Sequence, residues 1–376
     1  MGFLSEPDNP NFYYKHSGAN IKINYMIKAL HSIGIGVLFF SLGFSSKNKS
    51  FKKIKYSDFL TIYYAATIRG NNLFSKTFLL VQILFFLTFV LKKKDTLIFY
   101  HVERILPIII FFKKIKKFKL ILEVEENYNA VKGSSLRDID IENNQIAKAD
   151  SFIFVNDLFP KIIDTNKPYI VCYGDYNLKT KTKTKTKTKT KTKTKTNHGI
   201  IELVYAGLIS NELYGDVYLA IDAMHYLKEG YCLKIIGYGS IADINFLREY
   251  ISTQGLGDKV FYEGLLSGDE FSNYLSRCSI GLNPRVLENT ISDYTFPSKV
   301  LTYLSHGLSV VSTNINCIKE SKVSTAICFS EDSTPQAFSQ AIVEVDLSKK
   351  AEDVLNVLDK EFKSDLKRLL SNDSNR

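Results

Sequence analysis

The sequence predicts an α/β protein built from two doubly wound halves, and three observations support this fold class. Short apolar runs alternate with longer helical patterns through the first half, the alternation restarts in the second half, and a low-complexity tract separates the two. Strands separated by helices form parallel βαβ units. At 376 residues the chain is long enough for roughly two or three domains. We therefore expect two Rossmann-like domains that face a central cleft.

The first half is predicted to contain six strands and four helices. Apolar, β-branched runs indicate the strands, and apolar residues at helical spacing indicate the helices. The predicted strands are residues 2–5, 36–42, 96–100, 119–124, 151–155 and 169–172, and the predicted helices are residues 18–32, 75–92, 104–116 and 136–149.

The second half repeats this pattern. Its predicted strands are residues 200–208, 232–237, 259–263, 279–283, 308–313 and 326–330, and its predicted helices are residues 214–227, 241–253, 269–277 and 297–306. We place the domains at 1–178 and 198–345, with a linker at 179–197 between them. A charged helical segment at 346–376 follows, and it is expected to pack back toward the N-terminal domain.

The net charge of +10 is concentrated in the linker. Residues 179–196 are nine consecutive Lys-Thr pairs, so removing those nine lysines leaves a charge of +1. The tract has no apolar face and repels itself, which predicts an extended or disordered linker. It also lacks aromatic residues on which bases could stack, and this argues against nucleic-acid binding.

The cysteines and the N-terminus predict a cytoplasmic protein. The five cysteines form no CxxC pair and are odd in number, which argues against a disulfide framework or a zinc knuckle. The N-terminal residues lack the basic region and long apolar core of a signal peptide.

Two apolar segments bear on membrane contact. Residues 78–91 are shorter than the roughly twenty apolar residues that a membrane span needs, so we expect a buried helix, with a span as the alternative. Residues 104–119 join an apolar half to five lysines. That composition suits either contact with anionic lipid headgroups or a helix that packs on a sheet and has a solvated basic end.

Residues 296–314 read as a loop, a helix and a strand that together could hold an anion. Pro297 suits the first helical position and Gly307 the exit. The backbone N–H groups of Ser298, Lys299 and Val300 are then free at the positive end of the helix dipole, where Lys299 adds a full charge. An ordinary helix start is the alternative.

Three further segments place ligand-binding residues at the carboxyl ends of predicted strands, where ligands bind in open parallel sheets. They contribute Gly237 and Gly239, then Gly264 with its neighbour Leu265, and lastly Arg285. Each is a weak signal alone, because a plain turn or a solvated arginine would explain it equally well. Their order and spacing are more specific than any one of them.

In this order the segments YAG (205–207), IIGYG (235–239), FYEGLL (261–266), GLNPR (281–285) and FPSKVLTYLSHGLSVVST (296–313) resemble the nucleotide-sugar half of a group 1 (family 4-like) glycosyltransferase of GT-B fold, of the FPSK-containing polysaccharide-biosynthesis type. The resemblance covers residues 200–331 well and the first half more loosely. It implies that Gly264 and Leu265 line the base, that Gly237 and Gly239 border the phosphates, and that residues 298–300 hold the pyrophosphate. Retention of sugar stereochemistry is likewise implied by the family alone.

The sequence departs from this family at two places. Thr302 stands where a ribose-binding glutamate is common, and the usual lysine after the first strand of this half is missing. A neutral hydroxyl binds a ribose more weakly than a carboxylate does. Lys299 is therefore expected to be the principal cationic partner of the pyrophosphate. In the first half, the helix start at Gly18 would approach the donor phosphates in this family.

Three residues of the first half are candidates for catalysis or acceptor contact. His101 follows a strand at a position where the family often has a polar cleft residue, although a lone histidine is more often structural. Glu125 and Glu126 crowd a strand end together with Glu123, where mutual repulsion favours a site that uses carboxylates over a solvated edge.

The expected chemistry follows from charge. Breaking a sugar–phosphate bond develops negative charge on the leaving nucleoside diphosphate, which fixed donors and Lys299 would stabilise, so no metal or other cofactor is expected. Asp138 and Asp140 have the spacing of an Asp-x-Asp metal site but a polar setting, which favours coincidence. The sequence thus predicts a glycosyltransferase that acts on a glycan or lipid-linked acceptor, with peripheral contact to anionic membrane. A nucleotide-sugar epimerase of the same fold and a non-catalytic module that binds polyanions or membrane are the alternatives.

Overall fold

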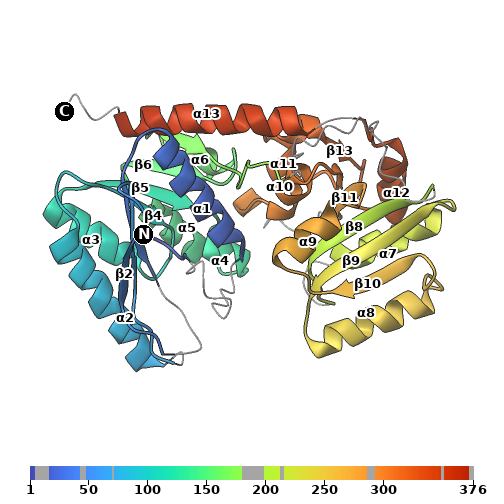
Figure 1. Ribbon diagram of the computed structural model, residues 1–376, viewed down its shortest axis with the longest axis horizontal. Coiled ribbons are helices and arrows are strands. Elements are labelled where there is room, and N and C mark those ends of the chain that lie inside the picture. Colours follow the sequence, from blue (N-terminus) through green and yellow to red (C-terminus); the bar gives the residue numbers. More distant parts are fainter. Residues whose placement is uncertain are drawn as a thin grey trace. The chain divides into compact units, whose positions relative to one another are not determined.

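The computed structural model describes residues 1–4, 17–42, 48–69, 72–179, 199–211, 216–285, 293–348 and 351–371 (Figure 1). The chain divides into two compact units. The first unit is Met1–Asp175 with Tyr294–Phe296 and Lys360–Arg376, and the second is Tyr176–Asp293 with Pro297–Asp359. The first division falls three residues before the predicted boundary at residue 178. The predicted linker lies outside the described residues from residue 180 to the boundary at 197.

The first unit holds two sheets. A three-stranded sheet has the order β1-β3-β2, and a four-stranded parallel sheet has the order β4-β5-β6-β7. The strands are β1 (Val37–Ser41), β2 (Lys52–Lys55), β3 (Leu60–Tyr64), β4 (Thr96–Tyr100), β5 (Lys119–Val124), β6 (Ser151–Phe154) and β7 (Tyr169–Val171).

The N-terminal residues connect these two sheets. The N–H of Tyr100 donates to the carbonyl oxygen of Met1 at 2.9 Å, and the N–H of Leu42 donates to that of Gly2 at 2.8 Å. The strand predicted at 2–5 is reduced to a single parallel bridge between Gly2 and Ser41, and its last residue lies outside the described part of the chain. Hydrogen bonding thus continues from β4 through residues 1–4 to β1.

Two strands of the first unit are absent from the sequence prediction. β2 reads Lys-Lys-Ile-Lys, is mostly exposed, and pairs antiparallel with β3 at the edge of its sheet. Because such a strand buries little apolar surface, it carries no apolar alternation that would reveal it. β3 pairs parallel with β1 on its other side, so the missed segment completes the sheet.

The helices of the first unit begin and end at residues suited to those places. The side chain of Asn72 accepts from the N–H of Ser75 at the start of α2, and Ser135 caps α5 in the same way. α3 ends at Lys117, whose φ of 57° is left-handed. The helices are α1 (Ser17–Ser32), α2 (Leu73–Phe85), the π-helical turn η1 (Phe86–Val90), α3 (Leu106–Lys116), α4 (Tyr128–Val131), α5 (Leu136–Ile146) and α6 (Phe159–Ile162).

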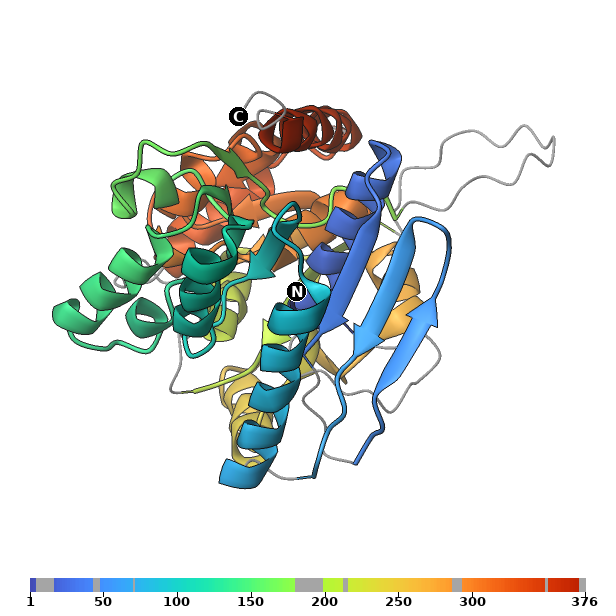
Figure 2. The same cartoon turned by 90° about the vertical axis from the view of Figure 1, so that its left-hand side faces the viewer.

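The prediction of a buried helix at residues 78–91 is wrong. α2 and η1 form one helix from Leu73 to Val90 with a mean hydropathy of 2.0, yet only 22% of it is buried. Among the described residues it is the one helix long and apolar enough to cross a membrane by length and composition. Figure 2 shows α2 toward the viewer, beside the three-stranded sheet. Leu79, Ile83 and Phe86 face the protein, and the opposite side of the helix is apolar and exposed.

The second unit is built on one parallel sheet of six strands in the order β10-β9-β8-β11-β12-β13. All six strands predicted for this half are present. They are β8 (Ile201–Leu208), β9 (Tyr231–Tyr238), β10 (Val260–Gly264), β11 (Ile280–Asn283), β12 (Ser309–Ser312) and β13 (Ile327–Phe329).

Helices cover this sheet, and the one at residues 335–344 was not predicted. The predicted helix at 214–227 corresponds to α7 (Asp216–Ala223) and the turn η2 (Met224–Tyr226) that follows it. Those predicted at 241–253, 269–277 and 297–306 correspond to α8 (Ile241–Thr253), α9 (Gly268–Leu275) and α10 (Ser298–Ser305). The remaining elements are α11 (Asn316–Lys319), η4 (Ser324–Ala326) and α12 (Pro335–Glu344).

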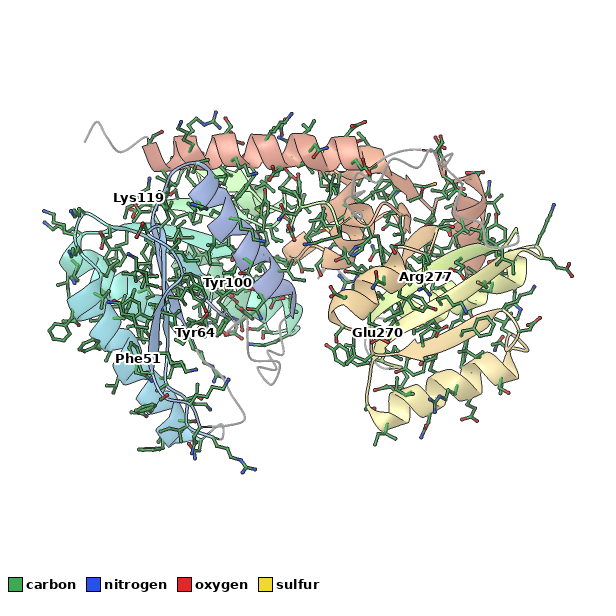
Figure 3. All side chains as sticks on the ribbon, in the orientation of Figure 1. Phe51, Tyr64, Tyr100, Lys119, Glu270 and Arg277 are labelled. Carbon is green, nitrogen blue, oxygen red and sulfur yellow. The ribbon has the colours of Figure 1, made fainter. Side chains whose placement is uncertain are left out.

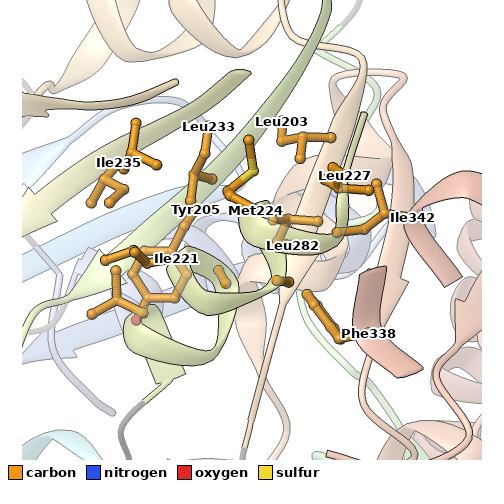
Figure 4. Close-up of a cluster of buried hydrophobic side chains, with 14 of the residues drawn as sticks. Leu203, Tyr205, Ile221, Met224, Leu227, Leu233, Ile235, Leu282, Phe338 and Ile342 are labelled. Atoms are coloured by element: carbon orange, nitrogen blue, oxygen red, sulfur yellow. The ribbon is translucent and has the colours of Figure 1, made fainter. Parts of the chain in front are cut away.

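The core of the second unit lies between the sheet and the helices α7 and α12 (Figure 4). Leu233 and Ile235 of β9 are fully buried, as are Ile221 of α7 and Phe338 of α12. Burying a side chain of this size contributes roughly 1.5–3 kcal/mol relative to leaving it exposed. This core fixes the ends of β8 and β9, at which the predicted glycines lie.

The last helix, α13 (Glu352–Ser371), begins six residues after the predicted segment at 346 and is shared by the two units. Within the first unit its C-terminal part packs on α1 and β5. The ring of Phe362 lies 5.5 Å from that of Tyr25, and the ammonium of Lys119 donates to the carbonyl oxygen of Leu369 at 2.8 Å (Lys119 is labelled in Figure 3).

Candidate functional site

The start of α10 forms the predicted anion site with one difference. Pro297 is the N-cap residue rather than the first helical residue, and Ser298 follows it, exposed. The N–H groups of Ser298 and Lys299 lie in the first turn, where a helix has no carbonyl partner for them. The N–H of Val300 donates to the carbonyl oxygen of Pro297 at 3.0 Å and its side chain is fully buried, contrary to our expectation of a free amide there.

Lys299 lies against an aromatic ring and a carboxylate. Its ammonium lies 4.3 Å from the centre of the Tyr205 ring and 3.7 Å from Oδ2 of Asp216, and 19% of its side chain is exposed. Burial lowers the pKa of Lys299 to about 8; Asp216 opposes that shift and the charge of Arg285 adds to it. Lys299 therefore loses its positive charge as the pH rises just above neutral.

Asp216, the first residue of α7, is a part of this site that the sequence analysis missed. Its carboxylate is 13% exposed, and its Oδ1 has no hydrogen-bond partner among the described residues. Burial raises the pKa of Asp216, while Lys299 and Arg285 lower it. An acidic residue in the first turn of a helix is ordinary, so nothing in the sequence distinguishes Asp216 from others.

The glycines at the ends of β8 and β9 are explained by close packing. A Cβ at Gly237 would collide with the carbonyl oxygen of Gly207, and one at Gly239 would collide with that of Ile209. A Cβ at Gly207 would lie 3.4 Å from the ammonium of Lys299. Gly237 and Gly239 thus let the two strand ends approach each other, and Gly207 leaves room for the lysine.

Gly264 and Leu265 lie at the end of β10, the edge strand of the sheet. Gly264 has a φ of 80°, and a Cβ there would meet no atom within 4 Å. Leu265 is 53% exposed. The backbone at this point requires a left-handed conformation that favours glycine, and it is open to a flat ligand.

Arg285 and Thr302 complete the predicted donor residues of the second unit. Arg285 follows β11, and its charge reaches both Lys299 and Asp216, so the fold brings these three groups together. The hydroxyl of Thr302 donates to the carbonyl oxygen of Ser298 at 3.1 Å, within α10 itself. The hydroxyl of Thr302 is therefore already bonded to its own helix.

In the first unit, His101 is a buried, neutral residue. It is 1% exposed, with Nε2 3.6 Å from Oε1 of Glu142 and Nδ1 3.4 Å from the carbonyl oxygen of Glu126. Burial lowers the pKa of His101 to about 4. Its backbone is fixed as well, because Tyr128 donates its hydroxyl to the carbonyl oxygen of His101 at 3.1 Å.

In the same unit, Glu123 and Glu125 pair with a lysine that the sequence analysis did not identify. Lys22 lies on the helix α1, which also carries the exposed Gly18 in its first turn. The ammonium of Lys22 is 2.7 Å from Oε1 of Glu123 and 2.5 Å from Oε1 of Glu125. Burial opposes its charge, but the two carboxylates raise the pKa of Lys22 above its ordinary value. Burial and the neighbouring Glu125 raise the pKa of Glu126 to about 7.

The Asp-x-Asp pair lies in an ordinary helix start. Asp138 is in the first turn of α5 and its Oδ2 accepts from the hydroxyl of Ser135 at 2.7 Å. Among the described residues, no group of three or more His, Cys, Asp or Glu side chains could hold a metal ion. Asp138 thus has a role at the start of α5.

A family model matches most of the second unit. Residues 201–345 match the family model of the glycosyl transferases group 1. No curated protein sequence matches the chain significantly.

Solved structures resemble the whole chain. One is sucrose-phosphate synthase from Thermosynechococcus elongatus, with a TM-score of 0.72 at 12% identity over 99% of this chain and 98% of that one. Another is HepE from Anabaena, solved with UDP, with a TM-score of 0.61 at 10% identity over 99% of both chains. A third is a glycosyltransferase from Rickettsia africae, with a TM-score of 0.59 at 13% identity over 99% of this chain and 98% of that one.

At such identities the likeness shows the fold, which is the predicted GT-B arrangement of two Rossmann-like domains. The family model independently covers the segments on which the sequence resemblance was based. Residues 201–345 therefore form a region that matches the glycosyl transferases group 1 family, within a chain that has the GT-B fold.

Proposed function

We propose that the protein transfers a sugar from a nucleotide-sugar donor to a glycan or a lipid-linked acceptor during synthesis of a surface polysaccharide. The observation that carries the donor part is Lys299, a part-buried lysine at the start of α10 with Arg285 nearby. A nucleoside diphosphate presents the charge that such a site recognises. HepE, which shares the fold, is solved with UDP and glucose, and this supports a donor of that class.

The proposed chemistry depends on charge at the leaving group. As the bond between the anomeric carbon and the phosphate oxygen breaks, electrons remain on the nucleoside diphosphate. Lys299, Arg285 and the N–H groups of Ser298 and Lys299 would stabilise that charge without a metal ion. Retention of stereochemistry is part of the proposal through the family resemblance alone.

The proposed acceptor contacts belong to the first unit. Glu126 is partly exposed and has its pKa raised to about 7, so it is poised to accept a proton from an acceptor hydroxyl at neutral pH. Glu125 is held beside it by Lys22. The reaction is proposed to take place in the cytoplasm at the inner face of the membrane, where lipid-linked acceptors are found.

A panel of nucleotide sugars, each assayed for release of nucleoside diphosphate with and without EDTA, tests this proposal. We expect one donor to be turned over and to raise the melting temperature of the protein, with EDTA having no effect. Activity abolished by EDTA and restored by a divalent cation would refute the metal-independent mechanism. Inactivity with every donor and acceptor would refute the donor class.

The pKa of Glu126 also favours a second candidate, a nucleotide-sugar epimerase of the same fold, because epimerisation needs acid and base groups around the sugar. The two activities differ in their products. Incubating the donor without an acceptor would give an isomeric nucleotide sugar from an epimerase, whereas a transferase would give no new nucleotide sugar.

A further inference from the structure

A stripe of large apolar side chains runs along the outer side of α2 and η1. Phe74, Val81, Phe85 and Phe89 follow one another at intervals of seven, four and four residues, which places them on one side of a helix. Phe74 is 67% exposed and Phe89 is 71% exposed, with the other two between half and two thirds exposed. The rings of Phe85 and Phe89 lie 5.0 Å apart, so they form a continuous apolar surface.

The inner side of the same helix is fixed to the first unit. The ring of Phe86 packs 4.6 Å from that of Phe40 in β1. Gln82 accepts a hydrogen bond from the N–H of Ala66 at 2.7 Å and donates one to the carbonyl oxygen of Ala66 at 3.0 Å. A helix tied to its sheet in this way presents its outer side to a surface and does not leave the sheet to cross a bilayer.

The helix α3 extends this apolar surface. The ammonium of Lys116, at the end of α3, donates to the carbonyl oxygens of Leu87 and Thr88 at 2.9 and 2.7 Å. The C-terminal ends of the two helices therefore meet. Phe111 and Ile115, one turn apart on α3, are 59% and 61% exposed. We call Phe111 and Ile115, together with Phe74, Val81, Phe85 and Phe89, the α2–α3 surface.

The charge around the α2–α3 surface is mostly positive. Asp95 lies in the turn after η1, where it accepts from the N–H of Lys92 at 2.8 Å, and Asp150 pairs with Lys113 of α3 at 2.7 Å. Neither residues 72–94 nor residues 104–119 contain an acidic residue. Exposed lysines gather where the two helices end, and they are Lys92, Lys93, Lys94, Lys114 and Lys117. An apolar stripe with a basic belt at one end is the composition that binds at the interface of an anionic bilayer.

We propose that the α2–α3 surface docks on an anionic lipid bilayer, with the phenylalanines among the acyl chains and the lysines at the headgroups. Charge complementarity selects this partner over a second copy of the chain. A symmetric dimer through the same surface would bring two basic belts together, and like charges there repel.

The absence of tryptophan from the chain permits a direct test. Phe85→Trp places a single reporter on the α2–α3 surface, and Phe246→Trp places the control reporter on α8 of the second unit, where Phe246 is 42% exposed. Emission is recorded with vesicles of phosphatidylcholine alone and with vesicles that also contain phosphatidylglycerol, with brominated acyl chains as quenchers. The Lys-Thr tract stays in both variants, so its own attraction to anionic vesicles is the same in each.

We expect the emission of Phe85→Trp to shift to the blue and to be quenched by brominated chains only when phosphatidylglycerol is present, and that of Phe246→Trp to stay unchanged. Replacing Lys92, Lys93 and Lys94 with serine should weaken vesicle binding on the order of a hundredfold, since each lysine near an anionic surface contributes roughly fivefold. These three side chains are exposed, so the variant is expected to fold.

Two results would overturn the proposal. Phe85→Trp protein that sediments with vesicles but shows neither shift nor quenching would mean that another part of the chain binds lipid. A concentration-dependent dimer, with the reporter already shifted in the absence of vesicles and the dimer lost in Phe89→Ser, would mean that a second copy covers the surface.

Discussion

Replacing Lys299 with methionine tests the donor site most directly. Methionine keeps most of the length and apolar volume of the side chain, so the change removes mainly the charge. A unit charge about 4 Å from a phosphate contributes about 4 kcal/mol at an effective dielectric constant near 20, or roughly a thousandfold in rate. Asp216, 3.7 Å from the ammonium, already neutralises part of that charge, so we expect a loss of about a hundredfold in kcat/KM.

Lys234→Met is the matched control for this experiment. Lys234 lies in the same unit and is 18% exposed, its ammonium is 3.3 Å from Oε1 of Glu263, and it lies 3.8 Å from the centre of the Phe261 ring. It thus shares the burial, the carboxylate and the ring of Lys299 without lying at the start of α10. Nucleoside diphosphate release gives the rates, and thermal melting checks that both variants fold. A Lys299→Met enzyme within threefold of Lys234→Met would refute our account of the site.

Three further predictions follow from charges and packing described above. Because Lys299 has a pKa of about 8 and is charged only below it, kcat/KM should fall as the pH rises through 8; the same fall in Lys299→Arg, whose charge persists, would contradict this. Gly237→Ala should cost about 2 kcal/mol or more of unfolding free energy in urea, whereas Gly257→Ala, where a Cβ meets nothing within 4 Å, should be nearly neutral; equal losses would show that packing does not require Gly237. Lys22→Met removes the cationic partner of Glu123 and Glu125 and should lower the free energy of unfolding by about 3–5 kcal/mol. Since burial raises the pKa of Glu123, the folded variant takes up protons and should regain stability as the pH falls; stability that is independent of pH would argue against this.

Much of the fold could be predicted from the sequence because the parallel strands are buried on both faces. β4 and β5 have the predicted bounds, since each centres on a short apolar run, residues 97–99 and 120–122, that polar residues flank. β2 could not be found because three of its four residues are lysines at a sheet edge. α2 was found but wrongly placed inside the protein. A helix that is apolar on every side gives no indication of which side meets the protein, and only the packing on β1 decides that.

The candidate site was predictable where its residues are close in sequence and not where the fold gathers them. Ser298 and Lys299 are neighbours at a helix start, which a sequence motif can reveal. Asp216 lies on another helix of the second unit and reaches Lys299 only through the tertiary structure, and in the first unit Lys22 of α1 reaches Glu125 in the same way. The amide of Val300 shows a further limit, because its bond to Pro297 depends on how tightly the first turn of α10 is wound.

The pairing of Lys299 with Asp216 has a consequence for the end of the catalytic cycle. When the sugar has left, the remaining nucleoside diphosphate must be released before the next turnover, and in many enzymes that step is slow. A carboxylate already within 3.7 Å gives the ammonium another partner, which lowers the cost of losing the product. Asp216→Asn should therefore dissociate from the nucleoside diphosphate more slowly than the wild-type enzyme, measured at a pH low enough to keep Lys299 charged without the carboxylate that raises its pKa; an unchanged off-rate would exclude this role. The acid would then set how fast the enzyme resets, while the lysine sets how fast it reacts.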